Sequence, residues 1–151
     1  MTPRWVVRSS FVLAIAALAV SVYLTIAHFT SPNILACSAS GAINCERVTT
    51  SAQSRFLGVP VAVLGLVWSV GIVALCSPSA WDSHALWIRG ARTSLVSVGI
   101  VFVLWLVYAE LLVIRAICLW CTAMHLLTFA LFVLVVLFGW SPQSRTFRPP
   151  R

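Results

Sequence analysis

Charge is scarce in this chain. Charged residues make up 9% of its 151 residues, against roughly 25% in soluble domains, and only three of them are acidic. This shortage excludes an ordinary soluble domain. Hydrophobic residues account for 61%, and the length has room for one domain. The chain is therefore predicted to be a single membrane domain over residues 1–151.

Four long apolar stretches predict how the chain crosses the membrane. They lie at 11–29, 56–76, 93–114 and 116–140, and Glu110 is the charge that interrupts them. Each comes close to or exceeds the ~20 residues needed to cross ~30 Å of hydrocarbon. Backbone groups in lipid must bond within their own segment, so these stretches should be helices. We expect an all-α integral membrane protein, a four-transmembrane-helix bundle with helices at about 9–30, 57–76, 92–115 and 117–140.

Lysine is absent, and the ten arginines sort by side. Seven flank what would be one face of the membrane and three the other. The first group is Arg4, Arg8, Arg89, Arg92, Arg145, Arg148 and Arg151; the second is Arg47, Arg55 and Arg115. The positive-inside rule then puts both termini and the 77–92 loop in the cytoplasm. The net charge of +7 thus indicates orientation in a lipid bilayer and not nucleic-acid binding.

The loop between the first two helices carries several local signals. Pro32 should end the first helix, and residues 38–41 are small and polar, which is typical of a flexible stretch. Asn44 is a plausible N-cap for a short helix that starts at Cys45. That helix could lie on the bundle as an outer lid. The 58–60 segment, Gly-Val-Pro, should turn the chain into the second helix.

Two cysteine pairs would face outward, where disulfides persist. Seven residues separate Cys37 from Cys45, a spacing that suits a loop-closing disulfide, so a static staple is one interpretation. Cys118 and Cys121 share a helical face, and a disulfide between them would add little stability. A helix N-terminus does favour thiolate, and Cys121 would lie one turn deeper, ~4.5 Å along the axis. Cys76 is expected to be a small buried side chain without a redox role.

Two other interpretations of the cysteines fit less well. A four-cysteine zinc site is disfavoured because Cys37 and Cys45 are wider apart than the two to four residues usual for zinc ligands, so no metal is expected. Residues 1–29 followed by Cys37 resemble a lipoprotein signal sequence. That apolar core is longer than the 7–15 residues typical of a signal peptide, and a polar run at 30–33 separates it from Cys37.

The order of these features resembles the vitamin K epoxide reductase family, and specifically its bacterial single-domain members. The resemblance runs from about Val12 to Leu137. Its specific parts are Cys37, Cys45, Ser51, Gly58-Val59-Pro60 with Gly65, and Cys118 to Cys121. In the DsbB-type quinone-linked oxidases the Cys-x-x-Cys motif comes in the first outer loop and the spaced pair in the second. Here the order is reversed, which favours the first family.

The resemblance implies a role for each cysteine. No fused thioredoxin-like domain is expected in the chain, so Cys37 would exchange with a separate thioredoxin-fold (DsbA-like) protein outside the cytoplasm, and Cys45 would attack Cys118. Cys121 would meet a membrane quinone, menaquinone or ubiquinone, as co-substrate, and Ser51 would assist in the pocket. The expected protein is a quinone-linked thiol–disulfide oxidoreductase of the bacterial inner membrane that supports disulfide bond formation.

Two departures from the family pattern leave alternative functions to be considered. His125 stands where the vertebrate enzymes have a tyrosine, and Val61 where they have an asparagine, and both of those residues help hold the vitamin. Reduction of vitamin K or its epoxide is thus one rival, and a non-catalytic, disulfide-stapled membrane protein is another. His125 shares a face with Cys121 and could hold or protonate a quinone, or simply pack. Glu110 could relay protons or pair with Arg115.

Overall fold

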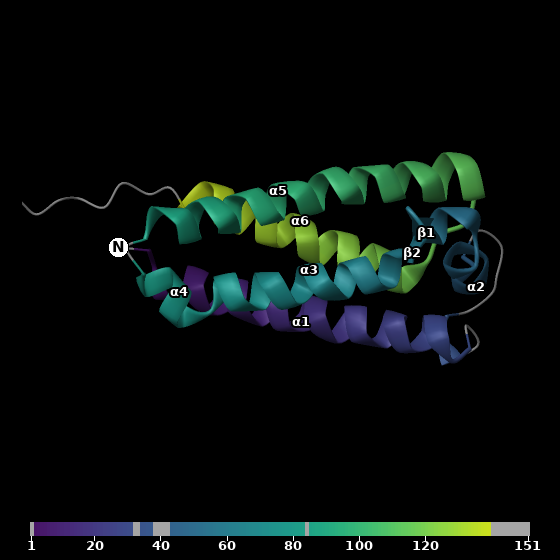
Figure 1. The fold of residues 1–151 in the computed structure, drawn as a ribbon, viewed down its shortest axis with the longest axis horizontal. Coiled ribbons are helices and arrows are strands. Elements are labelled where there is room, and N and C mark those ends of the chain that lie inside the picture. The colour runs from purple at the N-terminus through teal and green to yellow at the C-terminus, as the bar shows by residue number, and fades with distance from the viewer. Residues whose placement is uncertain (1, 32–33, 38–42, 84, 140–151) are drawn as a thin grey trace, which may run out of the picture.

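Helices make up almost all of the regular structure. The computed structural model describes residues 2–31, 34–37, 43–83 and 85–139. Its elements are α1 (Arg4–Phe29), α2 (Cys45–Thr49), η2 (Ala52–Ser54), β1 (Arg55–Phe56), β2 (Val59–Pro60), α3 (Val61–Cys76), α4 (Pro78–Asp82), α5 (Leu86–Tyr108), the π-helical η3 (Ala109–Ile114) and α6 (Leu119–Gly139). Helices α1, α3, α5 and α6 lie side by side along the long axis (Figure 1).

The length and composition of the helices fit a lipid environment. Three are long and apolar enough to cross a membrane, Arg4–Phe29, Leu86–Ile114 and Leu119–Gly139, and α3 is apolar but shorter, at 16 residues. Large apolar side chains on all four point away from the bundle and are more than half exposed, among them Val12, Val67, Val101, Leu126 and Leu137. An apolar surface of this extent is expected where lipid is the solvent. The predicted class, an all-α membrane protein, is confirmed.

Small side chains let α1 approach its neighbours closely. Its buried residues recur at helical spacing and include Ser10, Ala14, Ala17 and Ser21. Without a hydrophobic effect between helices in lipid, close backbone approach and dispersion contacts hold a bundle together. A second close contact joins α3 and α5, where the Trp68 indole N–H donates to the Leu95 carbonyl over 2.8 Å and its ring lies against Gly99.

The start of α3 differs from the expectation of a helix from residue 57. Residues 55–60 form a two-stranded hairpin in which Arg55 pairs with Pro60 and Phe56 with Val59. The turn residues Leu57 and Gly58 have φ values of 52° and 84°. A left-handed turn of this kind is typical of tight hairpins and cannot continue a helix. The helix therefore begins only at Val61.

The two ends of the bundle carry different features. The first residues of α1 and the short α4 lie at one end, and α2, β1 and β2 at the other (Figure 1). The N-cap predicted for α2 is confirmed, because the Asn44 side chain accepts the Arg47 N–H over 2.9 Å. The polar stretch 38–41 lies outside the described residues, as do Pro32, Arg145, Arg148 and Arg151.

Arg92, one of the arginines of the predicted cytoplasmic group, is buried. Its side chain is 2% exposed and donates to the carbonyl oxygens of Leu75 and Ala80 over 2.7 and 3.0 Å. The guanidinium also stacks on the Trp81 ring, 3.7 Å from its centroid. Arg92 thus ties α5 to the end of α3 and to α4. Cys76, in the same region, is buried and free, as expected.

Candidate redox site

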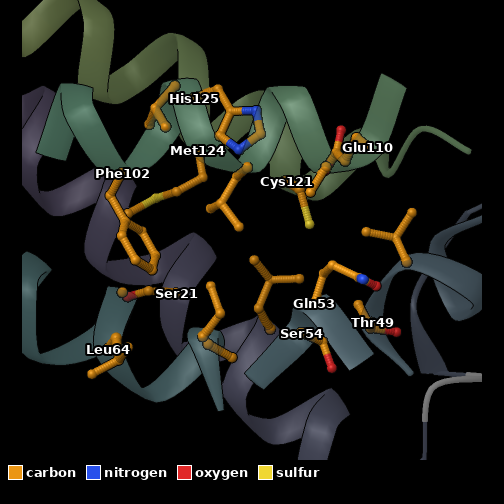
Figure 2. Close-up of a pocket in the computed structure, with 18 of the residues that line it drawn as sticks. Ser21, Thr49, Gln53, Ser54, Leu64, Phe102, Glu110, Cys121, Met124 and His125 are labelled. Carbon is orange, nitrogen blue, oxygen red and sulfur yellow. The ribbon is translucent and has the colours of Figure 1, made fainter. Parts of the chain in front are cut away.

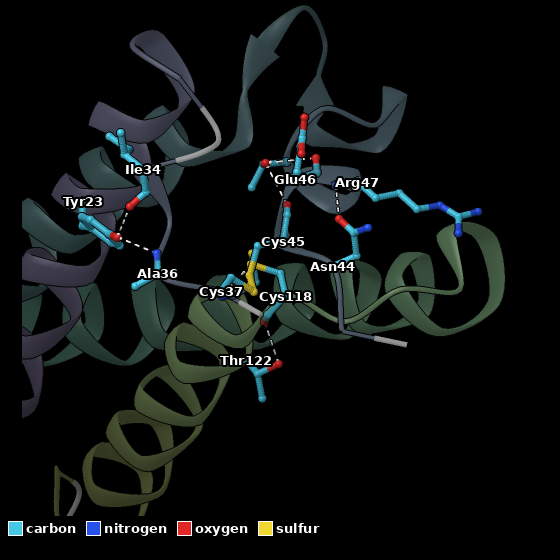
Figure 3. Close-up of a disulfide and its surroundings, with 12 residues drawn as sticks. Tyr23, Ile34, Ala36, Cys37, Asn44, Cys45, Glu46, Arg47, Cys118 and Thr122 are labelled. Atoms are coloured by element: carbon cyan, nitrogen blue, oxygen red, sulfur yellow. Dashed lines mark hydrogen bonds between the residues drawn. A yellow bond between two sulfur atoms is a disulfide. The ribbon is translucent and has the colours of Figure 1, made fainter. Parts of the chain in front are cut away.

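A disulfide joins Cys37 and Cys45 at the end of the bundle that holds α2 (Figure 3). The Cα atoms are 6.0 Å apart. Cys45 is the first residue of α2 and is 3% exposed, whereas Cys37 is half-buried in the preceding loop. A thiol arriving from solvent therefore has better access to the Cys37 sulfur than to that of Cys45.

A parallel bridge between two distant segments brings this disulfide to the second cysteine pair. Ile43 pairs with Ile117, and the Asn44 N–H donates to the Ile117 carbonyl over 3.1 Å. Cys45 and Cys118 follow these residues directly and belong to one buried cluster. Cys118 is fully buried, and Figure 3 shows it against the Cys37–Cys45 disulfide.

Cys118 and Cys121 are both free thiols at the start of α6. Cys118 precedes the helix, and its sulfur accepts the Cys121 N–H over 3.3 Å. Hydrogen bonding from the Cys121 thiol lowers the pKa of Cys118, assisted by the N–H groups of Cys121 and Trp120, and this outweighs the opposing effect of burial. Stabilising a thiolate in this way is how a helix start activates a cysteine.

Tyr23 of α1 holds the segment that leads into Cys37. Its hydroxyl donates to the Ile34 carbonyl over 2.7 Å and accepts the Ala36 N–H over 3.0 Å. Its ring packs edge-on against Trp120, with the centroids 4.7 Å apart. One side chain thus connects the loop of the outer disulfide to the helix of the inner pair. Sequence reasoning missed this contact, since a tyrosine in an apolar helix carries no signal of its partner.

A cavity of about 270 Å³ lies next to Cys121, which forms part of its wall (Figure 2). Its walls come from α1, α3, α5 and α6, with α2 and η2 contributing at one end. The lining is mainly apolar and includes Leu24, Leu64, Phe102, Leu106 and Met124. The Cys121 sulfur points into this space (Figure 2). An apolar cavity with a few polar groups is the usual form of a small-molecule site.

The polar groups of the cavity include both assisting residues named from the sequence. Ser51 and His125 line it, and so does Val61. The Ser51 hydroxyl donates to the Val48 carbonyl over 2.7 Å, and His125 is 8% exposed. Gln53 of η2 lies across the cavity from Cys121 (Figure 2). It was not predicted, because the direction of a side chain in a 3-10 turn cannot be obtained from sequence.

Glu110 lines the same cavity and is 6% exposed. Its carboxyl interacts with the Cys121 thiol and with the backbone of Cys118. The suggested pairing with Arg115 is not found: within the described ranges Glu110 has no ion pair, and Arg115 is exposed with a left-handed backbone, φ 54°. Among the described residues no group of three or more His, Cys, Asp or Glu side chains is placed to hold a metal ion.

Comparison with known families gives one match. The model of the vitamin K epoxide reductase family matches residues 9–136, which is most of the chain. The matched range contains both cysteine pairs and every residue that lines the cavity.

Proposed function

The chain belongs to the vitamin K epoxide reductase family, whose members are membrane oxidoreductases, and we propose that it passes electrons from an extracytoplasmic thiol protein to a membrane quinone. The donor is a reduced thioredoxin-fold (DsbA-like) thiol oxidase, and the acceptor is menaquinone or ubiquinone. One observation carries the proposal: Cys118 is buried against the Cys37–Cys45 disulfide, while Cys121, one turn on, points into an apolar cavity.

The first exchange occurs at Cys37. A thiolate of the reduced partner attacks the Cys37 sulfur, forms a mixed disulfide and releases Cys45 as a thiolate. The partner's second thiolate then attacks the partner sulfur that is joined to Cys37. The partner leaves with its two cysteines joined in a disulfide, and both outer cysteines are left as thiols. The difference in exposure supports Cys37 as the point of attack, because Cys45 is nearly buried and Cys37 is not.

The second exchange moves the electrons inward. The Cys45 thiolate attacks Cys118 in a Cys118–Cys121 disulfide and releases Cys121. Cys37 then attacks Cys45, which restores the outer disulfide and releases Cys118. The lowered pKa of Cys118 favours its departure, since a more acidic thiol is the better leaving group. The arrangement described above, outer pair joined and inner pair free, corresponds to the state before quinone reduction.

The last step oxidises the inner pair. Two electrons pass from the Cys118 and Cys121 thiols to the quinone, a disulfide forms between these cysteines, and the quinone gains two protons. The apolar walls suit the ring and the start of an isoprenoid tail. Gln53 and His125 are the groups placed to donate to its oxygens, and α2 with η2 acts as the lid. The Ser51 hydroxyl would assist by turning from the Val48 carbonyl to a quinone oxygen.

Quinone reduction is favoured over epoxide reduction by the same cavity. Family members also act on the epoxide of vitamin K. In this chain Val61 lines the cavity at the position where the vertebrate enzymes have an asparagine that holds the vitamin, so no amide is available there.

Orientation follows from charge. Arg4, Arg8 and Arg89 belong to the end of the bundle with the N-terminus, where Trp5 and Trp87 are exposed as an interfacial belt requires. We place this end in the bacterial cytoplasm, as the positive-inside rule demands, and both cysteine pairs on the outer face. Helix α3 spans about 24 Å at 1.5 Å per residue. Together with the hairpin of residues 55–60 that precedes it, it forms the fourth span.

A quinone-reduction assay with two electron donors tests the proposal. The purified protein should reduce a soluble quinone analogue with dithiothreitol, and Cys118→Ala or Cys121→Ala should abolish this activity. Cys37→Ala and Cys45→Ala should lose turnover with a thioredoxin-fold donor and keep much of it with dithiothreitol, because a small dithiol can reduce the inner pair directly. Wild-type rates in the inner-pair variants would leave a disulfide-stapled bundle as the better explanation.

A further inference from the structure

We propose that Glu110 is the proton acceptor for the Cys121 thiol and returns that proton to the quinone, an inference that rests on the proposed function. Oxidation of the inner pair releases two protons, and reduction of the quinone consumes two. Both events take place in a cavity with apolar walls, where water is scarce. A side chain that can hold a proton between the sulfur and the quinone oxygen is therefore needed.

The position of Glu110 meets this need. The side chain is 6% exposed and lies on the cavity wall beside Cys121 (Figure 2). It interacts with the Cys121 thiol. A carboxylate buried at the depth of a membrane helix is unfavourable without a partner. Within the described ranges Glu110 has no ion pair, and its carboxyl interacts with the Cys121 thiol and the Cys118 backbone. Structural salt-bridge stabilisation thus does not explain why this carboxyl is buried here.

The local backbone brings the carboxyl to the thiol. Residues 109–114 form a π-helical turn, an arrangement that recurs at functional sites. The Glu110 carbonyl accepts the Ala116 N–H over 3.2 Å, and Arg115 reverses the chain with a left-handed backbone. This corner returns the chain so that Cys118 and then Cys121 lie over the Glu110 side chain. Glu110 therefore accepts a backbone hydrogen bond at the end of its helix through its carbonyl and faces the Cys121 thiol with its side chain.

Other ionisable groups around the cavity are less well placed. His28 of α1 and His125 of α6 both line it. The groups that interact with the Cys121 thiol are Cys118 and Glu110, and neither histidine is among them. Lining residues from α2, η2 and α3 are apolar, hydroxyl or amide side chains, and the nearby Arg115 is exposed. His125 is better suited to bonding a quinone oxygen than to taking the Cys121 proton.

The proposed step is balanced. Cys118, whose lowered pKa favours the thiolate, has already released its proton. Glu110 as carboxylate takes the Cys121 proton as the two sulfurs bond to each other and give two electrons to the quinone. One quinone oxygen receives the proton held by Glu110. The proton lost by Cys118 balances the one gained by the second oxygen. Glu110 returns to the carboxylate form, and the products are one disulfide and one hydroquinone.

Replacing Glu110 by its neutral isostere glutamine separates the proton transfer from Cys121 from the earlier thiol exchange at Cys37. Inner-pair dithiols of wild type and Glu110→Gln are mixed with a quinone analogue in single-turnover experiments. We expect Glu110→Gln to be slower by about 100-fold, in the range typical of general acid–base catalysis. Thiol exchange at Cys37 should be unchanged. The variant should also recover rate as the pH is raised, because hydroxide replaces the missing base. Glu46→Gln, which neutralises an exposed carboxyl on α2, is the matched control and should behave as wild type.

A second measurement separates this inference from the proposed function. Alkylation of Cys121 by a lipid-soluble maleimide needs no quinone, and its rate should depend on pH differently in Glu110→Gln and in wild type, because the carboxyl group that exchanges a proton with this thiol has been removed. Equal alkylation at all pH values, or an unchanged single-turnover rate, would overturn the role of Glu110. Loss of quinone reduction in the wild type with the alkylation difference intact would instead reject the quinone.

The wild-type protein offers a test that does not depend on a variant folding. The chain has only three acidic side chains, so its carboxyl bands in infrared spectra are few. During a single turnover a carboxylic acid band should appear as Glu110 takes the Cys121 proton and disappear as the quinone is reduced, and Glu110→Asp should shift that band. The absence of any transient carboxylic acid band in time-resolved spectra would overturn the proposal.

Discussion

The Asn44 N–H donates to the carbonyl oxygen of Ile117 over 3.1 Å, and this bond joins two segments more than seventy residues apart in the chain. It extends the Ile43–Ile117 bridge, so the residue before the outer-pair Cys45 is held by the residue before the inner-pair Cys118. The outer and inner cysteine pairs therefore meet through main-chain register at Cys45 and Cys118.

The orientation of the bundle predicts which cysteine an impermeant reagent can reach. In intact cells treated with a membrane-impermeant reductant, Cys37 should react first with an impermeant maleimide, because it is half-buried while Cys45 and Cys118 are buried. The control is Asp82→Cys, an exposed position at the opposite end of the bundle, which should react only after lysis. Labelling of Asp82→Cys in intact cells, with Cys37 protected, would reverse the orientation.

Removal of Cys45 should trap the soluble partner. In Cys45→Ser the free Cys37 thiolate should attack the disulfide of the oxidised thioredoxin-fold partner and release the partner's second cysteine as a thiolate. Because Cys45 is no longer there to attack Cys37 and resolve this mixed disulfide, the adduct should accumulate. Non-reducing gels followed by mass spectrometry measure it. Cys76→Ser is the matched control, because Cys76 is buried and free in another part of the bundle, and it should give no adduct. An absence of adducts in Cys45→Ser would favour a static staple at this position.

Acid should slow the reactions of Cys118. Its pKa is lowered mainly by hydrogen bonding from Cys121, so the thiolate persists at pH values where an ordinary cysteine, with a pKa of about 8.5, is protonated. As the pH falls through that lowered pKa, the thiolate and its reactivity are lost. We expect the midpoint for modification of Cys118 by a small methanethiosulfonate, in a Cys37→Ser/Cys45→Ser protein, to lie below the ordinary value. Cys121→Ala should raise this midpoint, and an unmoved midpoint would mean that the backbone N–H groups alone lower the pKa.

Hydropathy and cysteine spacing predicted much of this structure, for physical reasons. Lipid requires every backbone group to bond within its own segment, so long apolar runs leave few alternatives to helices. The Asn44 cap was predictable because an N-cap is a local interaction. Long-range contacts were not: the Ile43–Ile117 bridge and the Tyr23 hydrogen bonds depend on tertiary register. Arg92 was counted as a cytoplasmic charge, yet carbonyl groups from two other helices bury it.

The cavity residues divide in the same way. Met124 lies three positions after Cys121 on one helix, so its place beside the thiol follows from helical periodicity alone. Gln53 depends on a 3-10 turn, and the setting of Glu110 depends on a π-helical turn. Neither distortion has a reliable sequence signal. The sequence could therefore name Glu110 as a candidate but could not show that it faces Cys121.

Gly99 and Trp68 both line the cavity and lie against each other, which gives a test of where the quinone binds. A methyl group at position 99 would stand 2.8 Å from the Trp68 ring, closer than real contacts allow, whereas one at Gly90 would meet nothing within 4 Å. In Gly99→Ala we therefore expect the Trp68 ring to move into the empty cavity, where a quinone must then displace it. Overpacking of this kind costs about 1–3 kcal/mol, so quinone binding should weaken by roughly five-fold or more. Steady-state assays should show a raised KM for the quinone analogue, while exchange at Cys37 and modification of Cys118 stay as in wild type. Gly90→Ala is the matched control and should keep the wild-type KM. If Gly99→Ala also keeps it, the quinone does not occupy the part of the cavity beside Trp68, and its ring must bind nearer to Gln53 and the lid.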